Sequence, residues 1–375
     1  MHRFLHTADW QIGRQYGRFH PDDAAALADA RFAAVERLAE LASQHAVDAV
    51  LVAGDIFDAQ TVSERTLRRL FLALEGFGGP WLLLPGNHDA ALAEGVWATA
   101  RRLRIIPPQV RVLDQPGVTV FADAGFAVLA APLTQRQTYT DLTQPFDDWT
   151  TPPGLLRIGL AHGSVQGLLA DGIDSPNPIA RHRAQSANLQ YLALGDWHGT
   201  REVDPRTWYA GTPEPDRFRN NDAGQALLVE LASATALPQV RSVRTGRHSW
   251  HDLTFTLQVA TDVDAMVAAL DTIVAPAVVQ VHVRGSVSLA DQQRLVQALA
   301  QAEARHRSVQ ADLTQLRLVP SASDLEQLRA DGYLADVLAE LRDAQQGPDG
   351  DVAGTALTLL AQLLREQNAG ATSCN

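Results

Sequence analysis

The sequence predicts an α/β protein in which a large domain is followed by a small α+β module and by C-terminal helices. Three observations support this fold class. Short apolar runs alternate with helical patterns over the first hundred residues, closely spaced strands follow, and a second strand–helix alternation begins after residue 250. The length of 375 residues suits two or three domains, and an apolar fraction of 46% is typical of globular chains.

The first hundred residues follow a strand–helix–strand rhythm, which is typical of a sheet covered by helices. Pro21 followed by Asp22 and Asp23 marks a helix N-terminus, because acidic side chains stabilise the first turn of a helix. Strands are expected at residues 4–7, 49–52 and 81–84, and helices at residues 22–45 and 63–74.

Shorter strands separated by turn residues follow after residue 108 and are consistent with a meander. They are expected at residues 110–113, 118–121 and 126–130, with further strands at residues 158–161, 191–194, 208–210 and 226–230. Residues 134–153 and 167–187 are expected to form surface loops. The small and polar residues at 232–247 suggest a domain boundary.

The remaining residues predict a compact module and a helical tail. In the module, strands are expected at residues 251–258, 278–283 and 309–318, and helices at residues 263–273 and 290–304. Residues 321–366 are expected to be helical, with a break at residues 345–351, where glycine and proline interrupt the pattern.

Charge and composition exclude several function classes. The net charge of −12 shows no strongly basic domain for binding nucleic acid. All 31 basic residues are arginine, which excludes lysine Schiff-base chemistry and a lysine-dependent phosphate loop. The single cysteine, Cys374, excludes an internal disulfide framework and suits a cytoplasmic location. No apolar run is long enough to suggest a membrane span.

Five short motifs carry side chains suited to chemistry, and each follows a predicted strand. They are Asp9-Trp10-Gln11, Gly54-Asp55-Ile56-Phe57-Asp58, Gly86-Asn87-His88-Asp89, His162-Gly163 and Gly195-Asp196-Trp197-His198. Such strand ends are where α/β sheets place their ligands. Any one of these motifs is most often an ordinary turn or surface loop. The five together, in order and each after a strand, favour a shared site.

Carboxylates, imidazoles and an amide form a mixed oxygen and nitrogen donor set. This set suits manganese or a comparable first-row metal better than calcium, which prefers oxygen ligands alone. Two such ions about 3.5–4 Å apart can clamp a phosphate group and activate the attacking water. One carboxylate must then bridge the ions, and Asp55 is the candidate.

The ordered motifs resemble those of the calcineurin-like metallophosphoesterase superfamily, and within it those of the SbcD-type DNA repair exonuclease subunits. The segments at residues 7–13 and 209–214 resemble that family's first motif and the turn that closes its nuclease domain. The resemblance implies a two-sheet sandwich flanked by helices. It also implies a nuclease domain at residues 1–235, an α+β cap domain at 245–320 and a helical partner-binding tail at 321–375.

The resemblance also implies roles for single residues. It assigns one metal to Asp9, Gln11, Asp55 and His198, and a second metal to Asp55, Asn87, His162 and Asp196. Both ions are expected to be Mn²⁺. His88 is expected to be the catalytic histidine, and Asp89 to orient it.

Two positions depart from the family pattern, which has histidine at both. Gln11 offers only a neutral amide oxygen, so the first metal is expected to bind more weakly than the second. Asp196 adds a negative charge and an oxygen ligand at the second metal.

The function that the resemblance implies is a DNA exonuclease or endonuclease subunit that hydrolyses phosphodiester bonds with two metals. Its expected partners are DNA and an SbcC-type coiled-coil ATPase, and related chains form homodimers. Arg14, Tyr16 and Arg18 follow the first motif and are candidates for contacts with DNA, although an ordinary surface loop explains them equally well. Two alternatives stay open: a small-molecule metallophosphoesterase, and a catalytically weak scaffold for the ATPase.

The tail at residues 321–366 carries nine acidic residues against three arginines. Leucines recur at helical spacing at positions 325, 328, 334, 338 and 341, and again at 357, 359, 360, 363 and 364. These leucines either pack on the cap module or dock into a groove of the partner ATPase.

Overall fold

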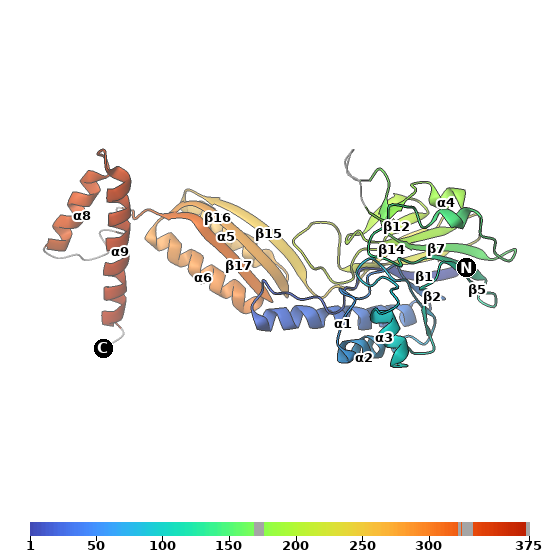
Figure 1. Ribbon diagram of the computed structural model, residues 1–375. Coiled ribbons are helices and arrows are strands. Elements are labelled where there is room, and N and C mark those ends of the chain that lie inside the picture. The colour runs from blue at the N-terminus through green and yellow to red at the C-terminus, as the bar shows by residue number, and fades with distance from the viewer. Residues whose placement is uncertain (169–175, 322–323, 325–332, 373–375) are drawn as a thin grey trace. The chain divides into compact units, whose positions relative to one another are not determined.

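The computed structural model describes residues 1–168, 176–321, 324 and 333–372 (Figure 1). The chain divides into two compact units, Met1–Ser249 and Trp250–Asn375. The first unit contains two six-stranded sheets, and the second contains one three-stranded sheet followed by a helical hairpin. The α/β fold with two large sheets, expected from the sequence, is therefore confirmed.

The two sheets of the first unit each combine parallel and antiparallel neighbours. The first sheet runs β14 (Gln239–Arg244), β13 (Gln225–Leu231), β1 (His2–Thr7), β2 (Ala49–Val52), β3 (Trp81–Leu83), β4 (Val110–Val112). The second runs β11 (Arg201–Asp204), β12 (Thr207–Tyr209), β10 (Tyr191–Gly195), β7 (Leu156–His162), β6 (Phe126–Ala131), β5 (Gly117–Phe121). A small separate ladder pairs β8 (Ser164–Val165) with β9 (Pro178–Ile179).

Helices cover the outer face of the first sheet. They are α1 (Pro21–Gln44), α2 (Glu64–Ala73) and α3 (Val96–Arg102). Buried residues of these helices, such as Leu38, Leu70 and Trp97, pack in one core with Val50 and Leu83 of the sheet. Alternate residues of a strand point to opposite faces of the sheet. The residues next to Val50 and Leu83 therefore face the second sheet.

The space between the sheets is filled by a second apolar core, in which Phe4 and Leu51 meet Phe126 and Leu160. The outer face of the second sheet is covered by α4 (Arg183–Ser186), the 3₁₀ helix η1 (Gln144–Asp147) and their loops. Both sheets are therefore buried on both faces, which explains why the strands β2, β3 and β6 are continuously apolar.

Strand direction brings the sequence motifs together. β1, β2 and β3 run parallel, with Thr7 beside Val52 and Val52 beside Leu83, so their carboxyl ends share one sheet edge. In the second sheet, β7 and β10 also run parallel, with His162 beside Gly195. The polar turns that follow these strands therefore collect in one place.

Two expectations about connectivity are corrected. The strands at 110–130 do not form a meander, because β4 pairs with β3 in the first sheet while β5 and β6 form a hairpin in the second. The boundary expected at 232–247 contains β14, which pairs with β13 as the edge of the first sheet. Periodicity locates a strand, but long-range hydrogen bonding decides which sheet it joins.

The second unit begins with a sheet ordered β15 (Ser249–Leu257), β16 (Ala277–Val287) and β17 (Ser308–Leu318). The helices α5 (Ala260–Thr272) and α6 (Leu289–Arg305) pack against it. Their buried side chains, including Met266, Leu270 and Leu295, share a core with the strand residues Val279 and Val281. This arrangement matches the α+β pattern that the sequence predicts.

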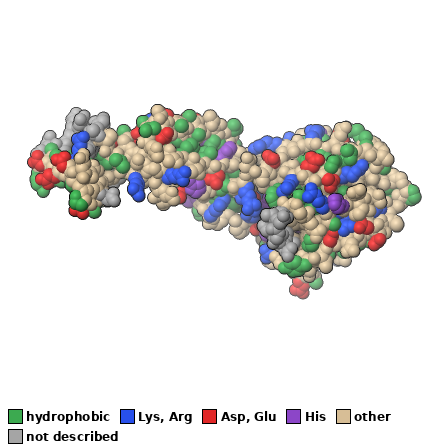
Figure 2. Space-filling view, turned by 90° about the horizontal axis from the view of Figure 1, so that it is seen from above, with side chains coloured by type: hydrophobic (Ala, Val, Ile, Leu, Met, Phe, Trp, Pro, Cys, Tyr) green, Lys and Arg blue, Asp and Glu red, His purple; other side chains and the backbone are tan. Residues whose placement is uncertain are grey.

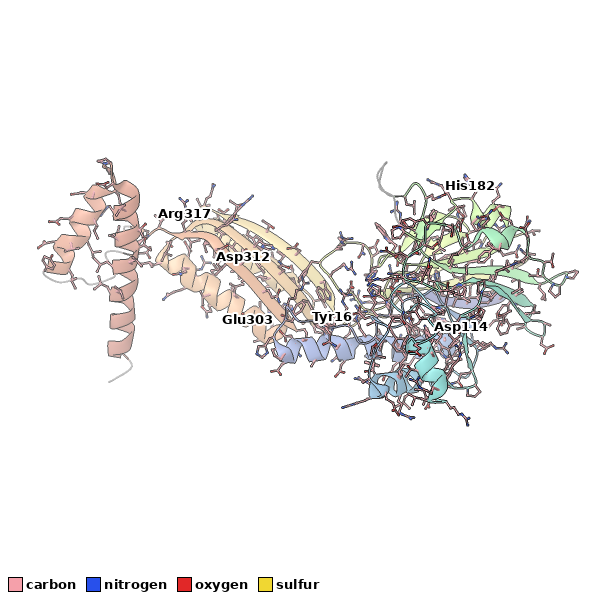
Figure 3. The ribbon with its side chains drawn as sticks, in the orientation of Figure 1. Tyr16, Asp114, His182, Glu303, Asp312 and Arg317 are labelled. Carbon is pink, nitrogen blue, oxygen red and sulfur yellow. The ribbon has the colours of Figure 1, made fainter. Side chains whose placement is uncertain are left out.

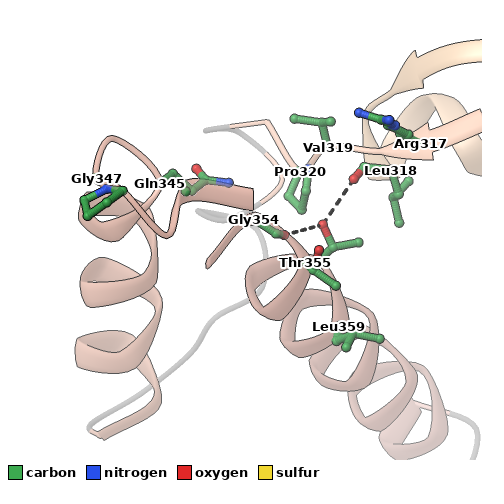
Figure 4. A pocket seen from close by; sticks show the side chains of 12 residues that line it. Arg317, Leu318, Val319, Pro320, Gln345, Gly347, Gly354, Thr355 and Leu359 are labelled. Atoms are coloured by element: carbon green, nitrogen blue, oxygen red, sulfur yellow. Dashed lines mark hydrogen bonds between the residues drawn. The ribbon is translucent and has the colours of Figure 1, made fainter. Parts of the chain in front are cut away.

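The chain continues into a hairpin of α8 (Tyr333–Ala344) and α9 (Gly350–Thr372). Leu338, Leu357, Ala361 and Leu364 form its buried core together with Leu289. The Thr358 hydroxyl lies 3.1 Å from the carbonyl oxygen of Leu318 and 2.8 Å from that of Gly354, beside a cavity of about 900 Å³ (Figure 4). Residues 325 and 328, two of the leucines of the expected stripe, lie outside the described residues. No described helix combines the length and the apolar character needed to cross a membrane.

Candidate metal site

The turns after the strands adopt unusual backbone angles at the site residues. Asp9, Gln11, Asp55 and Asp196 all have positive φ values, of 54°, 45°, 54° and 103°. Such angles are sterically unfavourable for residues other than glycine and are concentrated at functional sites, where the surrounding structure stabilises them. They turn these polar side chains away from the strands.

Two glycines make room for the site. A Cβ atom on Gly54 would lie 2.2 Å from Nδ1 of His162, and one on Gly86 would lie 2.2 Å from Oδ1 of Asp55. Both contacts are much shorter than van der Waals distance, so neither position accepts a side chain. The two glycines therefore let the loops after β2 and β3 approach the site closely.

Asp9, Asp55 and His162 form the centre of the site. Each is buried, and their ligand atoms lie within 4.8 Å of one another. Nε2 of His162 lies 2.8 Å from Oδ1 of Asn87, 3.5 Å from Oδ1 of Asp55 and 3.8 Å from Oδ1 of Asp196. We call Asp9, Asp55, Asn87, His162 and Asp196 the carboxylate cluster.

The electrostatics of the carboxylate cluster fit a cation. Burial alone would lower the pKa of His162, but the surrounding carboxylates outweigh burial and raise that pKa to about 9. Burial, reinforced by Asp55 and Asp196, raises the pKa of Asp9 to about 6. A site that holds a proton this firmly has an excess of negative charge, which a divalent metal would neutralise.

The donor atoms of the carboxylate cluster also fit a metal. Nδ1 of His162 lies 2.8 Å from the carbonyl oxygen of Ala53, which fixes that nitrogen as the donor and turns Nε2 into the site. Asn87 offers its amide oxygen in the same direction. Asp55, Asn87, His162 and Asp196 would hold the ion, with Asp9 beside them.

The residues around Gln11 do not fit a second ion in the same way. Nη1 of Arg14 lies 2.5 Å from Oε1 of Gln11, and Nε2 of Gln11 lies 3.1 Å from Nε2 of His198. A guanidinium group only donates hydrogen bonds. Arg14 therefore orients the Gln11 amide so that its oxygen points toward the arginine. The amide nitrogen, which cannot bind a cation, faces His198.

A buried carboxylate organises this side of the site. Oδ2 of Asp216 lies 3.4 Å from Nη1 of Arg14 and 3.7 Å from Nη2 of Arg31, and Oδ1 lies 2.9 Å from Nε of Arg217. Burial would raise the pKa of Asp216, but hydrogen bonds from His198 and Arg217 hold it well below its usual range. We call Arg14, Arg31 and Arg217, with Asp216 between them, the arginine cluster.

Arg31 and Asp216 are the residues of the arginine cluster that sequence reasoning missed. Asp216 lies two residues beyond the turn at 209–214, which resembles a family motif, so proximity to that turn was the available signal. Arg31 lies within α1, where its spacing suggests an ordinary helical residue. Only the fold shows that its guanidinium is 1% exposed and reaches Asp216.

His88, the expected catalytic histidine, is partly exposed at the site. Its Nδ1 lies 2.8 Å from the carbonyl oxygen of Asp58, so this nitrogen donates. Nε2 lies 4.0 Å from Oδ2 of Asp55, and the side chain is 30% exposed. The ring is therefore held at the rim of the carboxylate cluster with Nε2 turned toward it.

Asp89 has a different role from the one expected. It does not orient His88, whose Nδ1 is held by Asp58 instead. The Asp89 carboxylate is fully buried and accepts hydrogen bonds from the backbone N–H groups of Ile56, Phe57 and Gly86. It joins the loops after β2 and β3 and so positions Asp55 and Asn87.

The three residues expected to contact DNA, Arg14, Tyr16 and Arg18, lie in three different environments. Tyr16, labelled in Figure 3, is buried, and its hydroxyl accepts a hydrogen bond from Nε of Arg31 at 2.8 Å. It is therefore a core residue, whose aromatic ring the sequence could not distinguish from an exposed one. Arg14 belongs to the arginine cluster. Arg18 is exposed and lies over the rings of Phe19 and Phe218.

Two sandwiched sheets with carboxylates and a histidine gathered at their strand ends define the class of metal-dependent phosphoesterases. Residues 2–199 match the calcineurin-like phosphoesterase family. The chain therefore belongs to this family, as its motifs indicate.

Several characterised and uncharacterised proteins are similar to parts of the chain. The SbcD subunit of the nuclease SbcCD from Rhodobacter capsulatus is 41% identical over 96 residues, 24% of this chain and 22% of that protein. The DNA double-strand break repair protein Mre11 of Aeropyrum pernix is 28% identical over 66% of this chain and 62% of its own length. The uncharacterized metallophosphoesterase YhaO of Bacillus subtilis is 27% identical over 60% and 56%. Less than two thirds of each relative is matched.

Proposed function

We propose that this protein is a metal-dependent phosphodiesterase that cleaves DNA and works with an SbcC-type ATPase. The observation that carries the proposal is the grouping of Asp9, Asp55 and His162 within 4.8 Å at strand ends. Family membership supports hydrolysis of phosphate esters. The names of two relatives, a nuclease subunit and a DNA double-strand break repair protein, favour DNA as the substrate.

Different residues of the chain would bind the metal, position the loops and donate a proton. A divalent metal bound at the carboxylate cluster would polarise the phosphate and lower the pKa of a bound water. Asp89 keeps the loops of Asp55 and Asn87 in register through three backbone hydrogen bonds. His88 presents Nε2 beside Asp55, where it can donate to a phosphate oxygen or to the leaving oxygen.

The helical hairpin is the proposed ATPase-binding element. Val352, Leu359 and Leu363 are exposed by 70%, 56% and 62% and recur at helical spacing along α9. They form a stripe distinct from the buried residues Leu357 and Leu364. The same hairpin carries exposed acids at positions 336, 340, 343 and 349, and red side chains gather on it in Figure 2. An apolar stripe on an acidic hairpin suits a partner groove with a basic rim.

The substrate class can be tested with the purified full-length protein and Mn²⁺. Linear double-stranded DNA, single-stranded DNA, bis-p-nitrophenyl phosphate and p-nitrophenyl phosphate are compared at equal metal concentration. Cleavage of DNA and of the diester, with little hydrolysis of the monoester, is expected. Rapid hydrolysis of the monoester without DNA cleavage would favour the small-molecule alternative.

The partner can be tested with point variants that leave the buried core of the hairpin intact. Leu359→Asp with Leu363→Asp is expected to weaken capture of a purified SbcC-type ATPase at least tenfold. Val296→Asp is the matched control, because Val296 is 53% exposed on α6. Unchanged capture by the double variant would show that the stripe is not the docking surface.

A further inference from the structure

The side chains around Gln11 differ from those of a site that binds two metals. The family pattern has histidine at position 11, and this chain has Gln11, whose amide oxygen accepts from Arg14. A guanidinium 2.5 Å from the only metal-binding atom of that side chain occupies that atom and opposes a dication there, because like charges this close repel.

The surrounding residues stabilise positive charge at this point. Asp216 contacts three arginines and is nearly fully buried, and Asp58 lies 3.5 Å from Arg14, so two carboxylates face three guanidinium groups. Nη2 of Arg31 is buried and has no hydrogen-bond partner within the described part of the chain. Among these five side chains the guanidinium groups outnumber the carboxylates, and Arg14 contacts Gln11 while Asp216 contacts His198.

Arg14 keeps donors for a ligand. Among the described residues, its contacts with Gln11, Asp58 and Asp216 all use Nη1. Nη2 and Nε are not used by these contacts, and the side chain is 25% exposed. Arginine binds phosphate through a planar pair of N–H donors, which these two nitrogens provide.

We propose that this chain holds a single divalent metal, at the carboxylate cluster, and that Arg14 replaces the second metal as the positive charge that binds the substrate phosphate. Asp196 supplies the single ion with one more anionic oxygen than the family's histidine does. The proposal rests on the metal-dependent phosphoesterase activity proposed above, but not on DNA being the substrate.

Metal content tests the first half of the proposal without an activity assay. Full-length protein is equilibrated with Mn²⁺, desalted, and measured by inductively coupled plasma mass spectrometry and electron paramagnetic resonance. One Mn²⁺ per chain with an uncoupled six-line spectrum is expected. Two ions with a spin-coupled spectrum would overturn the proposal. No bound Mn²⁺ would refute the metal site itself, and with it the proposed function.

Two variants separate the contribution of Arg14 from that of Gln11. Gln11→His alone is expected to keep one Mn²⁺ per chain, because the guanidinium remains. Gln11→His combined with Arg14→Ser is expected to bind two and to show spin coupling. Two ions in Gln11→His alone would overturn the role given to Arg14, and so would a single ion in a folded double variant, as judged by circular dichroism.

Binding of inorganic phosphate tests the second half. Titration of the Mn²⁺-loaded protein is expected to show a Kd at least tenfold weaker in Arg14→Gln, with partial recovery in Arg14→Lys, which keeps the charge. Arg68→Gln is the control, because Arg68 lies on the exposed surface of α2 in an ion pair with Glu64. Equal phosphate affinity in wild type and Arg14→Gln would overturn the assignment.

Discussion

The carboxylate cluster and the arginine cluster lie side by side in one unit but have opposite charge. Asp9 and Gln11 are two residues apart in the loop after β1, yet Asp9 faces Asp55 and His162 while Gln11 faces Arg14. In the first cluster, excess anionic charge raises the pKa of a histidine. In the second, hydrogen bonds from His198 and Arg217, reinforced by the charge of Arg31, hold the pKa of the Asp216 carboxyl group below its usual range.

The difference shows that two neighbouring parts of one site in a shared fold can carry opposite charge and bind different groups. In the carboxylate cluster, Asp9, Asp55 and Asp196 project from turns with positive φ. In the arginine cluster, by contrast, Arg31 lies within helix α1. What each half can bind is decided by a few side chains that touch those positions, above all Arg14 and Asp216. Each of the following predictions tests this contrast between the two clusters.

The largest effect is expected from Asp55→Asn, at the centre of the carboxylate cluster. Removing the charge should abolish metal retention and reduce the cleavage rate by about 10⁴-fold or more, because both the ion and its activated water are lost. Cleavage of bis-p-nitrophenyl phosphate and metal content measure this. Asp22→Asn is the control, since that side chain is 89% exposed. Retained metal would show that Asp55 is not a ligand.

His88→Ala should reduce kcat by about 10²–10⁴-fold while leaving metal content unchanged, because His88 is held by the Asp58 carbonyl at the rim of the cluster. Steady-state kinetics and metal analysis are measured on the same preparation. Wild-type turnover would remove His88 from the reaction, and loss of metal would make it a ligand instead.

Asp216→Asn should destabilise the fold by about 3–5 kcal/mol, because it leaves the buried Arg31 without its counter-charge. Urea unfolding at pH 7 measures the loss. The pKa of Asp216 is depressed in the folded state, so its stabilising effect is present above the unfolded pKa of 3.8 and declines as the pH falls. The difference from wild type should therefore shrink in acid.

The control for this prediction is Asp147→Asn. Asp147 pairs with Arg183 but is 35% exposed, so its loss should cost about 1 kcal/mol or less. If both variants lose the same stability, the arginine cluster does not depend on Asp216.

Measured per pH unit, the smallest effect is a pH dependence of Mn²⁺ affinity. Because the pKa of His162 is about 9 without metal, a proton must leave before Nε2 can bind an ion. Affinity should rise by up to about tenfold per pH unit between pH 6 and pH 9, and binding at pH 7.5 should release about one proton. Calorimetry in buffers of different ionisation enthalpy measures this. An affinity independent of pH would contradict the charge imbalance of the carboxylate cluster.

The sequence alone determined where the strands of the first unit lie and which polar residues form the carboxylate cluster at their ends. Apolar runs ending in glycine-rich turns located β2 and β3 to within a residue, and the polar residues after them are the ones that meet at the strand ends. Such information is local: a strand and its turn are encoded within about ten residues, and parallel pairing then places their ends together.

Only the tertiary structure decided which sheet each strand joins and what surrounds Gln11. Arg31 and Asp216 are far apart in the chain, and no periodicity links them, yet they meet at 3.7 Å in the core. Tyr16 and Asp89 have side chains whose chemistry suits a functional site, and both are buried. Tyr16 packs in the core, and Asp89 accepts hydrogen bonds from the backbone of two loops. Contacts between distant segments depend on the packing of the whole unit, so the charge at each half of the site could not be read from motifs.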